Sequence, residues 1–474
     1  MPFPYNKVLD EDIKKIISVT DEKRVFVGDE IREEFYHDEM PEYGVYAPEV
    51  YVEAISTKEV SEIMKLCYKR NIPVTVRGAG TGLAGGATCK YGGIMLSIMQ
   101  MNKIYEVDKE NMSITVQPGA LLCDVADVVS QAGLFYPPDP GERTASIGGT
   151  VITNAGGMKA VRYGVTRDYV RCLEAVLPDG EIVRFSSNVV KNTTGFDIKD
   201  LVVGSEGTLC VVTEITLKLI MPPKISRTLV MAFDEIEPCI ETVPKLLQQA
   251  FIPTAIEFLE RELLEIVERC LNKPFPVVEG KSFLIVMYDA NNQEEMDFCI
   301  ERACNLAIEM GALDVKICNT QERIASVWSV RASILEGMKA DSDAQEECDV
   351  VVPRAKIAEF VKSAKKIGQK YSIRVIVCGH AGDGNIHTEL LRQNLSDEVW
   401  EKNTKECLRE LYQKSKELGG QLSGEHGIGN GRIEQFEEFI GQRIYKLHKD
   451  IKLAFDEKLI LNPGKVIEVE HYDK

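Results

Sequence analysis

Glycine-rich turns joined to β-type runs dominate the first half of the chain. They recur four times between Arg77 and Leu217. Glycine adopts positive φ without steric cost and leaves the backbone bare, so main-chain N–H groups in such turns can face a ligand. One compact nucleotide-binding domain explains this repetition better than four independent loops do. The main segments are Gly78–Gly86, Tyr136–Gly141, Ser146–Gly157 and Gly204–Leu209.

The residues before the first turn predict a helix followed by a strand. Apolar residues recur at helical spacing across Ser56–Arg70, and Ser56 with Glu59 forms a capping-box pattern at its start. A proline then ends the helical pattern, and Val74–Arg77 has the composition of a β-strand. The chain therefore enters the Gly78–Gly86 turn from a strand.

That turn contains a G-x-G-x-x-G pattern at Gly80, Gly82 and Gly85, which on its own indicates a Rossmann dinucleotide site. The residues after it contradict this interpretation, because Gly92–Ile98 is short, apolar and β-like where a helix is required. No acidic residue follows at the spacing of a ribose contact. We expect a strand-to-strand loop whose N–H groups hold a diphosphate without a Rossmann helix.

A second cluster combines histidines with a glutamate. Two β-type runs, joined by a Gly-Asp-Gly turn, carry His380 and His387, and the later segment Ser423–Gly429 carries Glu425 and His426. Two imidazoles and one carboxylate suit a divalent cation such as Zn, Mn or Fe. His426 is then free to act as an acid or base. The alternative is a tight hairpin with hydrogen-bonded histidines, in which Asp383 stabilises the turn.

Composition limits the classes of function. The 474 residues are long enough for two or three domains, and 44% hydrophobic with 27% charged residues is typical of a soluble globular protein. A net charge of −18 argues against nucleic acid or an anionic membrane surface as the main partner. No targeting segment or membrane span is visible, so we expect a cytoplasmic protein. The 13 cysteines are scattered without C-x-x-C spacing, which predicts packing roles.

Eight motifs run in a fixed order from about Tyr43 to Lys465. They are RGAGTGLAGG at Arg77–Gly86, PPDPG at Pro137–Gly141, SIGGTVITNAGG at Ser146–Gly157, GVTRDYV at Gly164–Val170, GSEGTL at Gly204–Leu209, GHAGDGNIH at Gly379–His387, GEHGIG at Gly424–Gly429 and NPGK at Asn462–Lys465. Together they resemble the FAD-linked oxidases of the vanillyl-alcohol oxidase/p-cresol methylhydroxylase family, in the D-lactate dehydrogenase/glycolate oxidase large-subunit branch.

The resemblance implies an α+β fold with three parts. A two-subdomain, non-Rossmann FAD-binding domain of the p-cresol methylhydroxylase type takes residues 1–222. An α+β cap domain with the substrate site takes residues 223–456, and residues 457–474 return to the flavin. The residues agree, because Met221–Lys224 interrupts the chain at this boundary and strand-like and helix-like runs alternate beyond it. Those runs are Thr228–Phe233, Ser282–Tyr288, Glu294–Met310 and Arg354–Tyr371.

The resemblance also implies the residues that bind FAD. The first turn would hold the diphosphate, and the later turns would line the flavin and the adenine. The implied FAD-binding residues are Gly78, Ala79, Gly80, Thr81, Gly82, Leu83, Pro137, Asp139, Ser146, Gly149, Thr150, Asn154, Gly156, Tyr163, Gly164, Glu206, Gly207, Val211, Val212 and Asn462.

The chemistry implied is the oxidation of a small 2-hydroxy acid. The metal ion on His380, His387 and Glu425 would lower the pKa of the substrate hydroxyl. His426 would take the hydroxyl proton, and the hydride would pass to N5 of the flavin.

Arg331 matches the family's substrate arginine, for which the alternative is an exposed helix arginine. Asn385 and Tyr163 are weaker candidates for substrate contacts. The acidic segment Asp341–Asp349 favours a monocarboxylate such as lactate or glycolate, and D-lactate is the substrate that the family suggests.

The acceptor of the electrons is a separate question. No cysteine spacing provides a second redox centre in this chain, so the electrons must leave for an external acceptor. Relatives suggest an electron-transfer flavoprotein, in some cases within an electron-bifurcating complex. The alternatives are a quinone, an iron–sulfur partner or oxygen, with glycolate or another 2-hydroxy acid as the substrate.

Three other functions compete with this one. The first is a flavoenzyme similar to alkyl-dihydroxyacetone-phosphate synthase or an aldonolactone oxidase. This interpretation does not explain the paired histidines. A mononuclear iron oxygenase accounts for two histidines and a carboxylate but leaves the glycine-rich domain unexplained. A nucleotide-sensing scaffold does not need His426 and Arg331.

Overall fold

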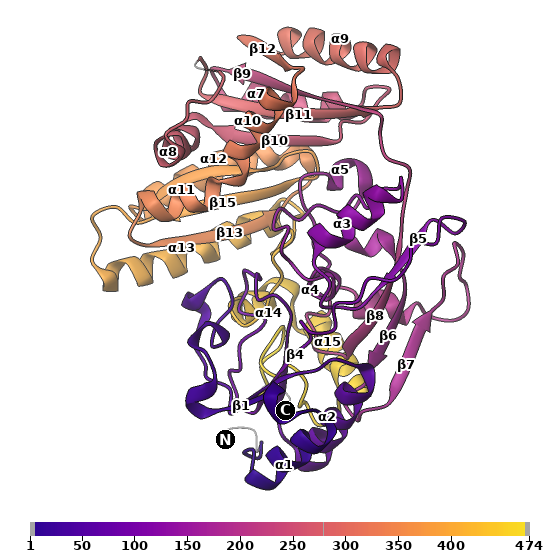
Figure 1. Ribbon diagram of the computed structural model, residues 1–474. Helices are drawn as coiled ribbons and strands as arrows, with labels where there is room; N and C mark the ends of the chain where they lie inside the picture. The colour runs from indigo at the N-terminus through magenta and orange to yellow at the C-terminus, as the bar shows by residue number, and fades with distance from the viewer. Residues whose placement is uncertain (1–4, 278, 470–474) are drawn as a thin grey trace. The chain divides into compact units, whose positions relative to one another are not determined.

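The computed structural model describes residues 5–277 and 279–469, which form two compact units (Figure 1). Unit 1 comprises Met1–Ala155, Val165–Pro222 and His426–Lys474, as far as these residues are described. Unit 2 comprises Gly156–Gly164 and Pro223–Glu425. A mixed α/β FAD-binding type of domain followed by a cap domain is the fold class that the sequence predicted.

Unit 1 contains two four-stranded sheets. The first has the order β1-β2-β4-β3, in which β2 and β3 run parallel to β4, and the second is antiparallel with the order β5-β8-β6-β7. The strands are β1 Val25–Val27, β2 Val50–Glu53, β3 Val74–Arg77, β4 Ile94–Ser97, β5 Ser113–Val116, β6 Val170–Val176, β7 Ile182–Ser186 and β8 Val211–Lys218. The α-helices are α1 Asp10–Val19, α2 Thr57–Arg70, α3 Leu122–Gln131, α4 Ile147–Thr153, α6 Ile198–Val202, α14 Ile433–Ile440 and α15 Gln442–Phe455.

Helix α2 confirms the helix predicted before the first turn, with one correction at its start. Ser56 caps the helix by accepting a hydrogen bond from the Glu59 N–H at 3.3 Å. The Glu59 carboxylate does not complete the predicted capping box, because it accepts from the Ile55 N–H at 3.0 Å and from Arg24 at 2.7 Å. Arg24, which directly precedes β1, thus competes for this carboxylate and connects α2 to the N-terminal segment.

The third glycine-rich segment is not simply a turn. Ile147–Thr153 forms helix α4, although glycine is a poor helix former. Ser146 caps this helix by accepting from the Gly149 N–H at 3.2 Å, and a bulkier residue is excluded at Gly148 because its Cβ would lie 2.6 Å from Pro118 Cβ. Tertiary packing therefore selects a glycine-containing helix where composition suggests a loop.

Unit 2 is built on one seven-stranded antiparallel sheet with the order β12-β9-β11-β10-β14-β15-β13. The strands are β9 Ile225–Phe233, β10 Ala255–Glu260, β11 Ser282–Ala290, β12 Asp314–Cys318, β13 Gln345–Val351, β14 Arg374–His380 and β15 Asn385–Leu391. The α-helices are α5 Ala160–Tyr163, α7 Ile236–Leu247, α8 Arg261–Leu271, α9 Gln293–Glu309, α10 Gln321–Ala332, α11 Ile334–Asp341, α12 Ile357–Lys370 and α13 Asp397–Glu417.

Helices α8, α10 and α11 cover part of one face of this sheet. Their apolar residues form a single core with residues of β9, β10, β11 and β14. Helices α7, α9, α12 and α13 pack in a row against the opposite face. The β13–β15–β14 end of the first face carries polar residues instead, and these form the site described below.

The last part of the chain groups with unit 1. We expected residues 223–456 to belong to the cap, but those from His426 onward group with unit 1. One reason is the buried Lys452 on α15, whose ammonium donates to the Thr208 carbonyl at 2.7 Å and to the Asp456 carboxylate at 2.6 Å. These buried contacts bind α15 to the residues before β8.

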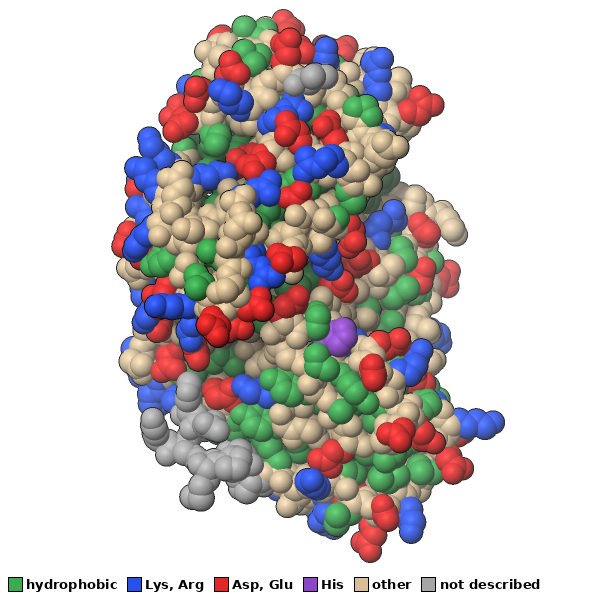
Figure 2. Space-filling model, turned by 90° about the vertical axis from the view of Figure 1, so that its left-hand side faces the viewer, with side chains coloured by type: hydrophobic (Ala, Val, Ile, Leu, Met, Phe, Trp, Pro, Cys, Tyr) green, Lys and Arg blue, Asp and Glu red, His purple; other side chains and the backbone are tan. Residues whose placement is uncertain are grey.

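The surface and the cysteines agree with a globular protein. On the face drawn in Figure 2, basic and acidic side chains are interspersed. Ten of the thirteen free cysteines are buried, which confirms the predicted packing role for most of them. Among the residues that the structure describes, no helix combines the length and apolar character that crossing a bilayer requires.

Candidate functional site

The histidine pair lies on the predicted hairpin. Strands β14 and β15 pair with His380 opposite Asn385 and with Cys378 opposite His387. The Asp383 carboxylate accepts from the Asn385 N–H at 3.2 Å, which is the role in the turn that the alternative interpretation gave it. Residues paired across antiparallel strands share a face, so His380 and His387 project from the same face of the sheet.

Both histidines meet Glu425 inside unit 2. The Nε2 atoms of His380 and His387 lie 3.2 and 3.3 Å from the same oxygen, Oε1 of Glu425. One ligand atom from each of the three residues lies within 4.8 Å of the others. The His380 and His387 rings stand edge to face with centroids 5.4 Å apart. Two imidazole nitrogens and one carboxylate oxygen that converge in this way fit a divalent cation.

The opposite ring nitrogens are held by two further acids. His380 Nδ1 lies 2.8 Å from Glu257 Oε1, and His387 Nδ1 lies 2.7 Å from Glu347 Oε1. A carboxylate accepts but does not donate, so Glu257 and Glu347 each fix a proton on Nδ1, and Nε2 is the ring atom that would bind an ion. The hairpin alternative, in which the histidines are merely hydrogen-bonded, does not require both Nε2 atoms to point at one oxygen.

Acidic side chains outnumber arginines at this face. Burial lowers the pKa of His380, but the charges of Glu257 and Glu425 outweigh it and raise that pKa to about 10. Burial, with the nearby Glu347 charge, raises the pKa of Glu389 to about 8. Five acidic side chains gather here with one arginine, Arg331, and the two histidines, and a cluster of acids of this kind suits a divalent cation. They are Glu257, Glu347, Asp349, Glu389 and Glu425.

Arg331 is not the exposed helix arginine of the alternative interpretation. It ends α10 with only 14% of its side chain exposed, and its Nε donates to Glu257 Oε2 at 2.6 Å. Glu257 therefore links Arg331 to His380. Asn385, the weaker candidate, is buried and donates to Asp349 at 2.7 Å, whereas the Tyr163 hydroxyl donates to Asp289 at 2.8 Å.

Sequence reasoning missed the acids behind the histidines. Glu257 lies 123 residues before His380 and reaches it only because β10 pairs with β14. Glu347 and Asp349 were visible as an acidic segment, and their spacing of two on a strand was a signal that both face one side. Their acidity has a local use in the site, which weakens the earlier inference from it about substrate size.

The first glycine-rich turn of unit 1 connects β3 to β4, as predicted. Four successive N–H groups, from Gly80 to Leu83, donate to no acceptor among the residues that the structure describes. Gly80 has φ +80°, and a Cβ at this position would lie 2.2 Å from Arg77 Nη2. A bare backbone with consecutive free donors fits an anion such as the diphosphate of FAD.

Ser146 and the second subdomain adjoin this turn. A Cβ on Gly78 would lie 2.3 Å from Ser146 Oγ, so the two segments touch only because residue 78 is glycine. The Asn154 side chain accepts from the Arg167 N–H at 2.9 Å and Thr150 is buried in α4. Gly156, Tyr163 and Gly164 belong to unit 2, whereas the other predicted FAD-binding residues belong to unit 1.

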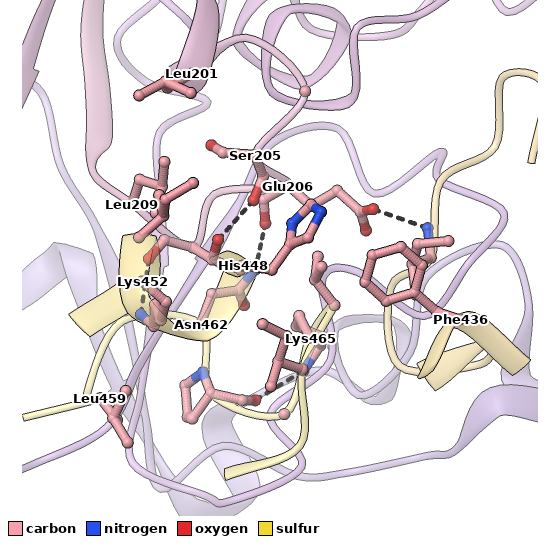
Figure 3. Close-up of a pocket in the computed structure, with 18 of the residues that line it drawn as sticks. Leu201, Ser205, Glu206, Leu209, Phe436, His448, Lys452, Leu459, Asn462 and Lys465 are labelled. Atoms are coloured by element: carbon pink, nitrogen blue, oxygen red, sulfur yellow. Dashed lines mark hydrogen bonds between the residues drawn. The ribbon is translucent and has the colours of Figure 1, made fainter. Parts of the chain in front are cut away.

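The C-terminal segment returns to unit 1 beside β3. The Asn462 N–H donates to the Val74 carbonyl at 2.6 Å, and the Asn462 side chain donates to the Glu206 carbonyl at 2.7 Å and the Gly86 carbonyl at 3.4 Å. Asn462 Oδ1 is buried and has no partner among the described residues. Asn462, Glu206 and Lys465 line a cavity of about 340 Å³, and Figure 3 shows the Asn462 side chain next to Glu206.

The Glu206 carboxylate binds the backbone of a neighbouring glycine-rich segment. It accepts from the N–H groups of Ile428 at 2.8 Å and Gly429 at 2.6 Å, and burial raises its pKa. It thereby fixes the glycine-rich segment that begins at His426, the first residue of the last stretch of unit 1. The free Oδ1 of Asn462 and the bare turn at Gly80–Leu83 both fit a polar ligand such as FAD.

Comparison with known proteins gives the same family as the sequence motifs. The family model for the C-terminal domain of FAD linked oxidases matches residues 222–466, and that for an FAD binding domain matches residues 48–186. A D-lactate dehydrogenase of Anaerostipes hadrus is 44% identical over 98% of both chains. A D-lactate dehydrogenase of Archaeoglobus fulgidus is 37% identical over 88% of this chain and 91% of its own, and the glycolate oxidase subunit GlcD of Bacillus subtilis is 34% identical over 91% of both.

Solved structures share the fold at low identity. p-Cresol methylhydroxylase with substrate bound aligns with a TM-score of 0.78 and 18% identity over 97% of both chains. An alkyldihydroxyacetonephosphate synthase aligns with a TM-score of 0.73 and 17% identity over 97% of this chain and 86% of its own. The match of the FAD binding model also removes the mononuclear iron oxygenase from consideration. The chain belongs to the FAD-linked oxidases, and it is an enzyme of that family with FAD as its cofactor.

Proposed function

We propose that this enzyme oxidises D-lactate to pyruvate. The observation that carries the proposal is the convergence of His380, His387 and Glu425 beside Arg331. It is supported by two relatives named D-lactate dehydrogenase, of which one matches 98% of both chains. Glycolate is the second candidate, because another similar relative is a glycolate oxidase subunit.

His380, His387 and Glu425 would hold one divalent ion, Zn, Fe or Mn. A bound cation supplies positive charge that lowers the pKa of a hydroxyl group placed against it. The carboxylate and the adjacent hydroxyl of a 2-hydroxy acid suit such an ion, since both oxygens can face it. The Asp349 carboxylate accepts a hydrogen bond from the Asn385 amide and so holds that amide at the same face of the sheet.

Arg331 would orient the substrate carboxylate. Its Nε is engaged by Glu257, so the guanidinium plane is fixed and its terminal nitrogens remain as donors. Such an arrangement holds the hydroxyl-bearing carbon in one position, and positioning of this kind is a large part of enzymatic rate enhancement. The buried location excludes water, which strengthens the charge–charge contact.

His426 would take the proton of the substrate hydroxyl. Imidazole is the side chain that most often serves as a general base in enzymes. FAD, when bound, supplies the acceptor for the hydride, which carries both electrons. In unit 1, the N–H groups of Gly80–Leu83 would hold its diphosphate, and Ser146, Asn462 and the other residues predicted from the family would surround the rest.

The electrons would leave through a redox protein, and an electron-transfer flavoprotein fits best. The thirteen cysteines are free and scattered, and ten of them are buried, so they offer no site for an iron–sulfur cluster. A complex that bifurcates electrons is one form of this partnership. Co-purification of the chain at native expression level checks the partner: recovery of this polypeptide alone, with rapid reduction of quinones or oxygen, contradicts it.

The decisive experiment is an anaerobic titration of the purified flavoprotein with D-lactate, L-lactate and glycolate. Loss of the oxidised flavin absorbance should occur first and fastest with D-lactate. Treatment with a chelator should suppress this loss, and added Zn²⁺ or Mn²⁺ should restore it. If the flavin bleaches equally with and without chelator, the metal role is wrong, and if glycolate bleaches it faster than D-lactate, the second candidate replaces the first.

A further inference from the structure

Each of the three candidate metal ligands is held by a different carboxylate. Glu257 contacts His380, Glu347 contacts His387, and Asp349 contacts the backbone at Glu425. The pairing of β10 with β14 and of β13 with β15 places these three acids on the same face of the sheet as the histidines. The regular alternation of side chains along strands thus produces a second layer behind the ligands.

Glu257 serves two groups at once. Its Oε1 accepts from His380 Nδ1 at 2.8 Å, and its Oε2 accepts from Arg331 Nε at 2.6 Å. The side chain is completely buried, so neither oxygen has water as a substitute partner. Both partners are donors in the metal-binding state, because His380 must keep its proton on Nδ1 to offer Nε2. Only a carboxylate satisfies two donors with two oxygens.

Asp349 organises the segment that carries Glu425. Its Oδ2 accepts from the Ser423 hydroxyl at 2.8 Å and from the N–H groups of Gly424 and Glu425 at 3.1 Å each, while its Oδ1 accepts from Asn385 at 2.7 Å. A Cβ on Gly424 would lie 2.2 Å from Asn385 Nδ2, so glycine is needed for this close approach. Four donors on one carboxylate fix the backbone from which Glu425 projects.

We propose that Glu257, Glu347 and Asp349 are positioning residues that set the affinity of the metal site, and that Glu257 also aligns Arg331 for the substrate carboxylate. This inference rests on the proposed function, since it takes His380, His387 and Glu425 as the ligands. Replacement of partners behind metal ligands lowers metal affinity by roughly 10–100-fold in other sites. The same range is expected here.

The amide variants test the inference because they keep size and lose one acceptor. In Glu257→Gln, one of the two donors, His380 Nδ1 or Arg331 Nε, must face an NH₂ group. In Glu347→Gln, the amide can still present its oxygen to His387, so the loss of charge alone weakens the contact. Asp349→Asn keeps one oxygen for the loop and should be milder than Asp349→Ala, which leaves the loop donors without an acceptor.

Glu260 provides a matched control on the same strand. It is 7% exposed and accepts from Lys365 at 2.7 Å and from the Val377 N–H at 2.8 Å. Its side chain lies on the opposite face of β10 from Glu257, since the two residues are three positions apart along the strand. Glu260→Gln therefore removes a buried charge from the same strand without touching the ligands.

The measurement is a titration of the chelator-treated, full-length flavoprotein with Mn²⁺. The electron paramagnetic resonance signal of free Mn²⁺ reports binding without any turnover, and oxidised FAD does not obscure it. Glu257→Gln and Glu347→Gln should weaken Mn²⁺ binding by roughly 10–100-fold. In steady-state assays at saturating Mn²⁺, Glu257→Gln should also raise KM for D-lactate more than Glu347→Gln does, because Glu257 holds Arg331 as well as His380. Thermal unfolding of each variant checks that it is folded.

Each outcome bears on a defined claim. Unchanged Mn²⁺ affinity in folded Glu257→Gln and Glu347→Gln overturns the inference and leaves the proposed function intact. Equal weakening in Glu260→Gln overturns it as well, because the effect then follows loss of any buried charge. If the wild type binds no Mn²⁺, or binds it equally after His387→Ala, the proposed metal site itself is wrong. Should one amide variant fail to fold, the other and the Asp349 pair still decide the matter.

Discussion

The two candidate binding regions, one in each unit, use opposite chemistry. The Gly78–Gly86 turn of unit 1 offers backbone N–H groups and almost no side chains, and glycine makes its conformation possible. The β13–β15–β14 end of the unit 2 sheet offers charged side chains, each fixed by a further side chain. The first suits a ligand that brings its own reactivity, as FAD does. The second suits a small ion and substrate whose reactivity the protein must create.

This difference predicts different sensitivities to mutation. In unit 1 the dangerous change is any added Cβ, because the backbone itself is the binding surface. In unit 2 the dangerous change is a lost or reversed charge, because the strands tolerate many side chains but the buried acids must balance the cations. The four predictions below test this difference. The first concerns His426, which lies in unit 1 but is proposed to act through its side chain.

His426→Ala should have the largest effect. This residue lies in a glycine-flanked segment of unit 1, yet it is proposed to act through its side chain. Loss of a general base typically lowers turnover by about 10²–10⁴-fold. Steady-state kinetics with D-lactate measure the loss, and the flavin spectrum should show FAD still bound in full. A variant that retains more than about a tenth of the wild-type rate removes His426 from the mechanism.

Arg331→Lys should raise KM for D-lactate by roughly 10–100-fold. Hydrogen bonds to charged groups contribute about 1.5–3 kcal/mol, and lysine keeps the charge but loses the planar fork. Mn²⁺ affinity should change much less than KM. Arg323 on the same helix α10 is exposed, so Arg323→Lys is the matched control and should leave KM unchanged. An unchanged KM in Arg331→Lys places the substrate carboxylate elsewhere.

Gly80→Ala should weaken FAD binding by roughly tenfold. A side chain at φ +80° costs about 1–2 kcal/mol, and the new Cβ would also press on Arg77. Gly86 in the same turn is the control, because a Cβ there meets nothing within 4 Å and its φ is ordinary. FAD retention after gel filtration, compared for Gly80→Ala and Gly86→Ala, measures the difference. Equal retention means that the turn does not bind by its backbone.

The smallest effect concerns pH and Lys465. Burial lowers the pKa of Lys465 to about 8, from 10.5 for an ordinary lysine. Between these pH values the unfolded chain holds this proton and the folded chain does not. The free energy of unfolding therefore gains from Lys465 as pH rises through this window, and the gain is lost as pH falls through about 8.

Urea unfolding of wild type and Lys465→Met across this pH range isolates that contribution. The wild type should gain stability relative to the variant as pH rises. Parallel curves for the two proteins show that Lys465 is protonated alike in the folded and unfolded states. That result contradicts the buried position of its ammonium group, which donates to the Thr88 carbonyl at 2.8 Å.

The sequence predicted those helices and hairpins that depend mainly on neighbouring residues. The helix at α2 follows from apolar spacing and a Ser56 cap, and the β14–β15 hairpin follows from two β-type runs around a Gly-Asp-Gly turn. Helix α4 was missed because glycine and hydroxyl residues resemble a loop in composition. Its stability comes from packing against Pro118, which the sequence does not display.

The sequence by itself determined which residue types carry the chemistry, because motifs fix the order of glycines, histidines and the Glu425-His426 pair along the chain. Tertiary structure alone decided which acids stand behind those histidines and which unit holds the described residues from His426 onward. The physical reason is strand pairing: β10 and β14 are brought together by burial of a shared apolar face, and this places Glu257 against His380 across 123 residues of chain.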